Sequence, residues 1–405
     1  MLYKLLYILF IISISFGGNL HIVGTTPRQV AAVVMLLLCI LNFRIIRPYL
    51  KCFFKLYIAY LVIALILAYL DDYAVAFGKT LLSQHLVAMA SMGAIIVYYN
   101  KYKSFDLIIW TFVFCGLANA IVCILQYLVN PIGLAIGYIF IGQEEGQAVR
   151  HMEQLSDGSG SGYLLGMRGD AVHNGYFQMI MPFLLTHLYR KYDWSKSFIL
   201  KSAYYLVLAL FFIVILLIQE RSCILIAVCV FLLYLKNAFT LLNSSKKAKY
   251  ILSGLIMLCI VSYFAIPYFE EYLLDSRFMA EDSGLRSGLL VACADFIPQH
   301  LFLGGWNTFC TKYVFPPHNI FLNSLIEAGI FGFFIALVLY FRQLKMSWSI
   351  PKLDENILII YAFIAYTLNS QLHNDSILTG DVIVWTLWGI VMCVYFNYKL
   401  LLVRK

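Results

Sequence analysis

The sequence predicts an all-α polytopic integral membrane protein. Hydrophobic residues make up 62% of the 405 residues and charged residues only 12%, whereas soluble domains average about 45–50% and about 25%. Most apolar runs are close to the length of about 20 residues that a helix needs to cross a bilayer. The alternation of polar and apolar residues over about ten residues that marks a transmembrane β-strand is not seen.

The apolar runs give about twelve candidate transmembrane helices in what we predict to be a single membrane domain, residues 1–405. The first run has no clean small-residue cleavage site and further runs follow it, so we interpret it as an uncleaved helix. The candidate spans cover roughly residues 2–17, 29–43, 54–70, 81–99, 106–129, 173–189, 202–219, 222–242, 249–267, 319–341, 357–372 and 382–399.

Lysine and arginine indicate how these spans are oriented. If the N-terminus lies in the cytoplasm and the spans alternate, all but eight of the 29 basic residues fall in cytoplasmic segments or adjoining helix ends. This bias follows the positive-inside rule and places both chain ends inside. The net charge of +8 therefore reflects topology and gives no reason to expect nucleic-acid binding. The eight basic residues on the outer side are Arg28, Lys79, Arg150, Arg168, Arg221, Arg277, Arg286 and Lys312.

Two outer loops are long, at about residues 130–172 and 268–318, while the other outer loops are short. Unequal loops on one face indicate that this face carries the function. The second loop should contain short helices, among them an amphipathic helix at roughly 284–296. Its apolar residues near helical spacing are Leu285, Leu289, Val291 or Ala292, and Phe296.

The outer face offers no pattern for a metal or nucleotide. It has no HExxH motif and no paired histidine and cysteine spacing, and the chain lacks a P-loop and a GxGxxG fingerprint. We therefore expect no metal ligands and no cofactor. Cys293 and Cys310 fall in the second outer loop, where they could form a disulfide in an oxidising compartment or remain free in apolar surroundings.

Four ionisable residues each allow a structural and a functional interpretation. Arg221, in a tight outer turn, could pair with Glu220 or hold a phosphate through its planar guanidinium. Arg286, near the start of the amphipathic helix, could be a solvated charge or an anion ligand. His318 follows two prolines at a helix start, where it could cap the helix or accept a proton near neutral pH. Glu327 lies inside a span, where it could fix helix packing or serve function.

Several short motifs follow one another over about residues 165–335. They are Arg168 to Asn174, Glu220-Arg221-Ser222, Ser283-Gly284-Leu285-Arg286, Leu303-Gly304-Gly305-Trp306, and His318-Asn319 with nine residues before Gly329-Ile330-Phe331-Gly332. This order resembles the superfamily of bacterial O-antigen polymerases and O-antigen ligases. Two details differ from that superfamily: Leu285 separates Gly284 from Arg286 where it often has Ser-Gly-Arg, and its glycine run more often reads Gly-x-Gly.

The resemblance implies a metal-independent inverting glycosyltransferase of the bacterial inner membrane with a periplasmic active site. Its donor would be an oligosaccharide on undecaprenyl diphosphate, and a chain-length regulator protein is a further partner of such enzymes. Arg221 and Arg286 would neutralise the leaving diphosphate in place of a metal, and His318 would activate the acceptor hydroxyl. The substrate-binding residues would be Arg168, His173, Asn174, Arg277, Trp306 and Asn319.

Three functions remain open on the sequence. The long outer loop before the sixth span and the Pro-Pro-His-Asn-Ile-Phe-Leu sequence at 316–322 favour a polymerase, which joins lipid-linked repeat units. A ligase would use the same donor and transfer the glycan to lipid A–core. A transporter or flippase for the lipid-linked sugar is the third, although the spans carry few charges to line a path.

Overall fold

The computed structural model describes an all-helical chain. It covers residues 2–16, 26–50, 53–141, 153, 164–168, 171–218, 220–240, 282–313, 317, 319–372 and 378–403, and no strand occurs among them. His318 and Arg277, two of the predicted site residues, lie outside this set. Arg221 and Arg286 are placed on their helices, but only their backbone is described.

Eleven of the twelve predicted spans coincide with helices, and the remaining one, 249–267, lies outside the described residues. Among the described residues, six helices are long and apolar enough to cross a membrane, and α2 (Pro27–Leu41) with α3 (Phe43–Leu50), bent by 91°, would make a seventh. The chain is thus a multi-pass helical membrane protein, while the total of twelve spans stays a prediction. The eleven helices are α1 (Leu2–Phe16), α2 (Pro27–Leu41), α4 (Phe53–Leu70), α6 (Leu86–Tyr102), α7 (Asp106–Tyr127), α10 (Ala171–Lys191), α11 (Phe198–Ile218), α12 (Arg221–Thr240), α16 (Ile320–Trp348), α17 (Ile357–Asn369) and α18 (Val382–Val403).

The centre of the bundle is formed by α10, α17 and α18. Their largest side chains, such as Tyr176, Phe183 and Trp388, are fully buried. A helix that is covered on all sides carries buried residues around its whole circumference, and α10 does so although it contains Pro182. By contrast α11 exposes Leu206 and other large apolar side chains, as expected of a helix that faces lipid.

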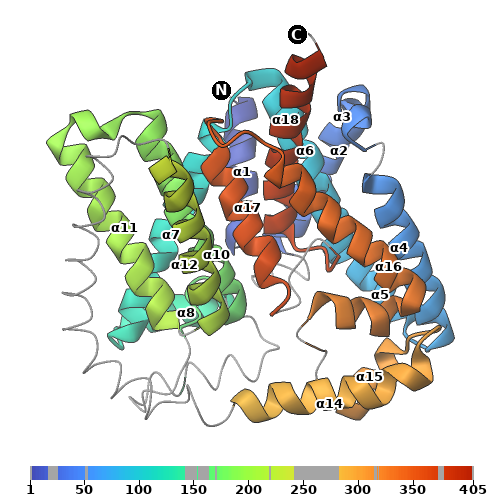
Figure 1. The fold of residues 1–405 in the computed structure, drawn as a ribbon. Helices are drawn as coiled ribbons and strands as arrows, with labels where there is room; N and C mark the ends of the chain where they lie inside the picture. The colour runs from blue at the N-terminus through green and yellow to red at the C-terminus, as the bar shows by residue number, and fades with distance from the viewer. Residues whose placement is uncertain are drawn as a thin grey trace.

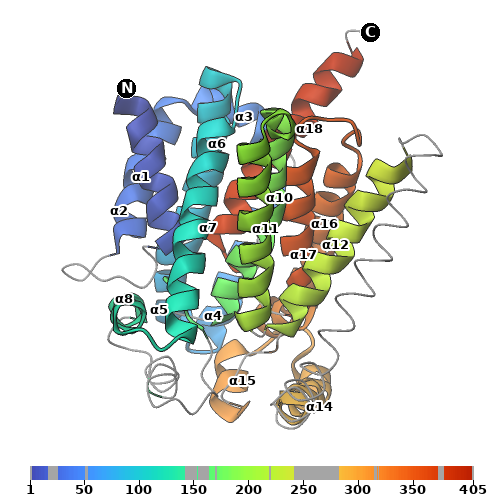
Figure 2. The same cartoon turned by 90° about the vertical axis from the view of Figure 1, so that its left-hand side faces the viewer.

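Both chain termini lie at one end of the bundle, together with the short helix α3, and four other short helices lie at the opposite end (Figures 1 and 2). We call these the terminal end and the distal end. A shared side for both termini is what the charge bias predicted. The distal helices are α5 (Ala74–Thr80), which continues through a π-turn (Leu81–His85) into α6, and α8 (Pro131–Ile141), α14 (Asp282–His300) and α15 (Trp306–Tyr313).

Helix α14 lies across the distal end (Figure 1). It contains the amphipathic helix predicted at 284–296. Its buried side chains Leu289, Ala292, Cys293 and Phe296 follow helical spacing, while Val291 is 61% exposed. Ala292 rather than Val291 therefore belongs to the inward face. This face packs on Phe309 of α15 and Ile326 of α16 in a small separate core.

Candidate functional site

A corner of the distal end joins the first turns of α10, α12 and α16 to the last turn of α17. A Cβ built on Gly175 would lie 3.1 Å from Cys223 Sγ, so the starts of α10 and α12 are in close contact. The Asn369 side-chain amide donates to Cys223 Sγ at 3.2 Å. The Ile320 amide donates to the Ser370 carbonyl at 3.2 Å. We call this group of helix ends the distal corner.

The distal corner contains the backbone position of Arg221 and the residue that follows His318. Arg221 is the first residue of α12, two residues before Cys223. Asn319 directly follows His318 and is the N-cap of α16. The contacts through α17 therefore bring together two segments, 220–223 and 319–320, that are about a hundred residues apart in the chain. Arg286 is in the first turns of α14, which packs on α15 and α16.

Asn319 holds the start of α16. Its Oδ1 accepts from the backbone amides of Phe321 at 2.9 Å and Leu322 at 3.2 Å. Its Nδ2 donates to the Gln371 carbonyl at 3.0 Å. A side-chain oxygen that satisfies otherwise unpaired amides in the first turn typically contributes about 0.5–2 kcal/mol. Asn319, predicted as a substrate ligand, thus caps α16 and ties its start to the end of α17.

Arg168 reaches the end of α1. Its Nη1 donates to the carbonyls of Ser15 at 2.6 Å and Ile14 at 3.2 Å. The guanidinium also lies over the Phe177 ring, 5.3 Å from its centroid. A cation at the C-terminus of a helix satisfies free carbonyls and complements the helix dipole. These contacts tie the segment before α10 to α1.

Asn174, another predicted substrate ligand, is fully buried. Its Nδ2 donates to the Leu164 carbonyl at 2.8 Å, and its Oδ1 accepts from Asn119 Nδ2 at 2.6 Å. The Asn119 oxygen in turn accepts the Met167 amide at 2.7 Å. These amides anchor the chain just before α10, where the partly buried His173 lies in the first helical turn.

The glycine motifs singled out by the resemblance form one unit. The backbone of α16 breaks at Gly329, where φ is +60°, and the chain at 301–305 enters the break. The Ile330 amide donates to the Leu301 carbonyl at 2.8 Å, and the Gly305 amide donates to the Ile326 carbonyl at 2.8 Å. In a regular helix the Ile330 amide would bond the Ile326 carbonyl itself. The inserted chain therefore replaces that one bond with two.

Trp306 is the first residue of α15, immediately after this insertion. It is partly buried and packs against the small core under α14. Asp71, which sequence reasoning missed, caps the same helix: its carboxylate accepts from the amide of Asn307 at 2.5 Å and the hydroxyl of Thr308 at 2.6 Å. The sequence did contain a signal for this cap, since Asp71 and Asp72 follow directly after the predicted span 54–70.

Glu327 lies two residues before the break in α16 and is partly buried. Tyr60 of α4 donates its hydroxyl to Glu327 Oε2 at 2.7 Å. One turn away on α4, the Tyr57 hydroxyl lies 2.5 Å from Nδ1 of His85, which is in the π-turn. Ionisable residues within spans and π-turns are often found at functional sites. Within the described ranges, no three His, Cys, Asp or Glu side chains are grouped as metal ligands.

Cys293 and Cys310 are free thiols in the structure and border the same small core. Burial raises the pKa of the Cys293 thiol to about 11. Burial, with a smaller contribution from Asp71 and Glu327, likewise raises the pKa of the Cys310 thiol to about 11. Both thiols are protonated at neutral pH and are therefore poor nucleophiles.

A comparison of the chain with protein-family models found no match, and a comparison with curated proteins found none either.

Proposed function

We propose that this protein is a surface-polysaccharide polymerase of the bacterial inner membrane. It would be an inverting, metal-independent glycosyltransferase that joins glycan repeat units carried on undecaprenyl diphosphate. The observation that supports the proposal most is the distal corner, where the start of α12 at Arg221 and the start of α16 after His318 are joined through α17. Two of the motifs that resemble the polymerase and ligase superfamily, Glu220-Arg221-Ser222 and His318-Asn319, thus adjoin this corner.

Two helix N-termini at this corner suit an anionic leaving group. The helix dipole gives each N-terminus a partial positive charge that favours phosphate. Arg221, the first residue of α12, would add a full positive charge at that position. Arg286 would supply a second charge from α14. Opposite charges fixed in a medium of low dielectric stabilise a developing anion more than they would in water.

The reaction needs one bond to form and one to break. The acceptor hydroxyl oxygen would bond to the anomeric carbon as the bond from that carbon to the diphosphate oxygen breaks. His318 would take the hydroxyl proton, and the diphosphate would leave with the bonding electrons. Attack from the face opposite the leaving group inverts the anomeric configuration. General-base assistance of this kind typically contributes about 10²–10⁴-fold in rate.

The test is glycan transfer by the purified full chain in nanodiscs, with a lipid-diphosphate-linked repeat unit as the only sugar substrate. Arg221→Ala, Arg286→Ala and His318→Ala should each lower transfer by about a hundredfold or more while leaving the folded yield unchanged. Arg44→Ala is the matched control, because Arg44 is exposed at the terminal end. Normal polymer from all three variants would refute the assignment.

A ligase would use the same donor and the same chemistry as a polymerase, so the two functions differ only in the acceptor. A strain without a polymerase would leave core capped by a single repeat unit. A strain without a ligase would leave uncapped core and accumulate polymer on the lipid carrier.

The transporter alternative is favoured by one observation, the Glu327 and Tyr60 pair beside the break in α16. Transporters place ionisable groups and interrupted helices at their substrate sites. Glu327→Gln distinguishes the two functions. If the protein is a transporter, Glu327→Gln should abolish the movement of lipid-linked sugar across vesicle membranes. The unmodified transporter would also form no glycosidic bond.

A further inference from the structure

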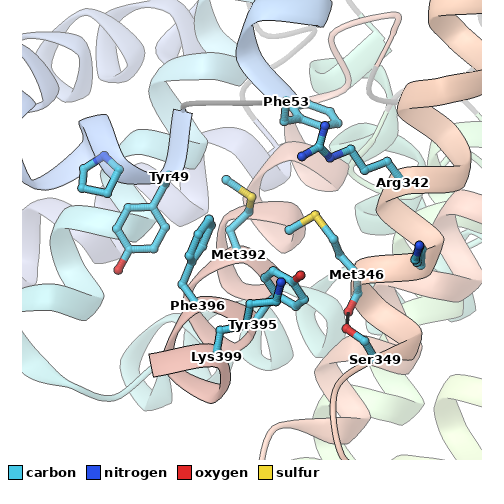
Figure 3. Close-up of a pocket in the computed structure, with 11 residues that line it drawn as sticks. Tyr49, Phe53, Arg342, Met346, Ser349, Met392, Tyr395, Phe396 and Lys399 are labelled. Atoms are coloured by element: carbon cyan, nitrogen blue, oxygen red, sulfur yellow. Dashed lines mark hydrogen bonds between the residues drawn. The ribbon is translucent and has the colours of Figure 1, made fainter. Parts of the chain in front are cut away.

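The terminal end contains a cavity of about 550 Å³ on the side of the bundle formed by α3, α4, α16 and α18. Tyr49 of α3, Phe53 of α4 and Met392 of α18 are among the residues that line it (Figure 3). The bend between α2 and α3 turns α3 across this end of the bundle. The cavity lies at the end opposite to the distal corner and is thus separate from the proposed site of glycan transfer.

Three cationic side chains line the cavity. Arg342 and Lys345 are one helical turn apart on α16 and therefore share a face, and Lys399 comes from α18. The Lys399 ammonium lies 5.1 Å from the centroid of the Tyr395 ring (Figure 3). Of the described residues that line the cavity, none is an aspartate or a glutamate. The lining therefore carries positive charge that no lining carboxylate neutralises.

The remaining lining is mainly apolar and partly flexible. Met346 and Met392 bring two thioethers into the cavity, and Phe53 and Phe396 add aromatic faces (Figure 3). Methionine adapts its shape to a variable ligand, and aromatic rings pack well against hydrocarbon. A small free anion would leave this surface uncovered, whereas an apolar ligand alone would leave the three cations without a counter-charge.

An amphiphile with an anionic head satisfies both parts of the lining. We propose that this cavity binds an anionic phospholipid, with the phosphate between Arg342, Lys345 and Lys399 and an acyl chain against the methionines and aromatic rings. The orientation predicted from the Lys and Arg bias places the terminal end at the cytoplasmic leaflet. Basic pockets between transmembrane helices on that side are suited to anionic head groups. The proposal does not depend on the enzymatic function.

The test is native mass spectrometry of the full chain in detergent, titrated with phosphatidylglycerol, phosphatidylcholine or inorganic phosphate. The unmodified protein should bind phosphatidylglycerol at least about tenfold more tightly than phosphatidylcholine. The variant R342Q/K345Q/K399Q should lose this preference. The control R190Q/K201Q/K236Q removes the same charge from exposed positions on α10, α11 and α12 and should retain the preference.

A second variant keeps the charges and obstructs the cavity. Ser349 is exposed, lines the cavity and directly follows α16. Ser349→Trp should weaken phosphatidylglycerol binding by about tenfold through steric exclusion, without loss of a cation. Equal binding of the two lipids, or an unchanged preference in both lining variants, would overturn the proposal. Inorganic phosphate that displaces phosphatidylglycerol at equal concentration would also overturn it, because the site would then be one for a soluble anion.

Discussion

Two stretches of irregular chain are held between helices at the distal end, and they are held by different means. The segment 164–168 is fixed by side-chain amides of Asn119, Gln126 and Asn174. The segment 301–305 is fixed by the main chain of α16, which opens at Gly329 to receive it. We call them the amide-held segment and the glycine-held segment. Irregular backbone near lipid must have its polar groups satisfied, and these are two solutions to the same requirement.

The two solutions differ in what they demand of the sequence. In the amide-held segment the partners are side chains, and Gln126 bonds both the amide of Gly166 at 2.9 Å and its carbonyl at 3.3 Å. In the glycine-held segment the partners are backbone groups, so no particular side chain is needed. The backbones must instead approach so closely that a side chain is excluded: a Cβ on Gly304 would lie 2.4 Å from the Ile326 oxygen.

The largest effect is expected when the glycine-held segment is broken with Gly329→Ala. The new Cβ would lie 2.2 Å from the Phe302 oxygen, a backbone atom, at a residue with φ +60°. Overpacking typically costs about 1–3 kcal/mol, and left-handed backbone adds about 1–2 kcal/mol for a residue other than glycine. We expect a large fall in the thermal unfolding midpoint of the purified protein in detergent.

The matched control for this change is Gly288→Ala. Gly288 lies in the exposed part of α14, and a Cβ there would meet no atom within 4 Å. Alanine in a helix is favoured over glycine by about 0.8–1.0 kcal/mol, so this variant should be as stable as the unmodified protein or slightly more so. Equal unfolding midpoints for the two glycine variants would show that the close approach at Gly329 is not needed.

A smaller effect is expected when the amide-held segment is broken with Asn119→Ala. The change leaves the Met167 amide and the Asn174 oxygen without the partners that they have at 2.7 and 2.6 Å. A buried polar group left without a partner costs about 1–3 kcal/mol. The unfolding midpoint should fall, but less than for Gly329→Ala because no atoms overlap.

Asn356→Ala serves as the control for the asparagine change. Among the described residues, the Asn356 side chain bonds only Asp354, two residues away, at 3.2 Å, and it is partly exposed. Its loss should change stability by no more than about 0.5 kcal/mol. If Asn119→Ala were equally mild, water or a neighbouring group would be replacing the amide, and the side-chain network would not be what holds the segment.

Sequence reasoning found the helices more readily than the contacts between them. Long apolar runs predicted eleven helices that the structure contains, because burial in lipid requires a continuous stretch of apolar residues. Spacing alone did not decide whether Val291 or Ala292 faces the core, because both positions fit an apolar stripe on a helix. Only the direction of the neighbouring helices decides between them. Helix α8 was part of what the sequence presented as a loop, because its eleven residues are too few to suggest a span.

The distal contacts were beyond the sequence for a different reason. Arg168, Asn174 and Asn319 are polar residues near helix ends, and this pattern suits a ligand site and a structural bond equally. Only the coordinates show that Asn174 is fully buried and that Arg168 bonds the end of α1. The contact between Gly304 and Gly329 could not be predicted either, because nothing in the two glycine motifs indicates that their backbones lie together.

The reactivity of one thiol distinguishes opening of the glycine-held segment from opening of the amide-held segment. Burial raises the pKa of the Cys310 thiol, which packs against the small core that contains Ile326, to about 11. Because only the thiolate reacts, labelling by a maleimide should be slow at pH 8 and should quicken about tenfold per pH unit up to that pKa.

Opening of the glycine-held segment by Gly329→Ala would admit water to Cys310 and return its pKa toward about 8.5, the value of a free cysteine. Labelling at pH 8, measured by mass spectrometry of the peptide that contains Cys310, should then rise by up to about a hundredfold. Asn119→Ala, which loosens only the amide-held segment, should leave this rate unchanged. If both variants accelerated Cys310 equally, the two segments would open together and the distal end would behave as one cooperative unit.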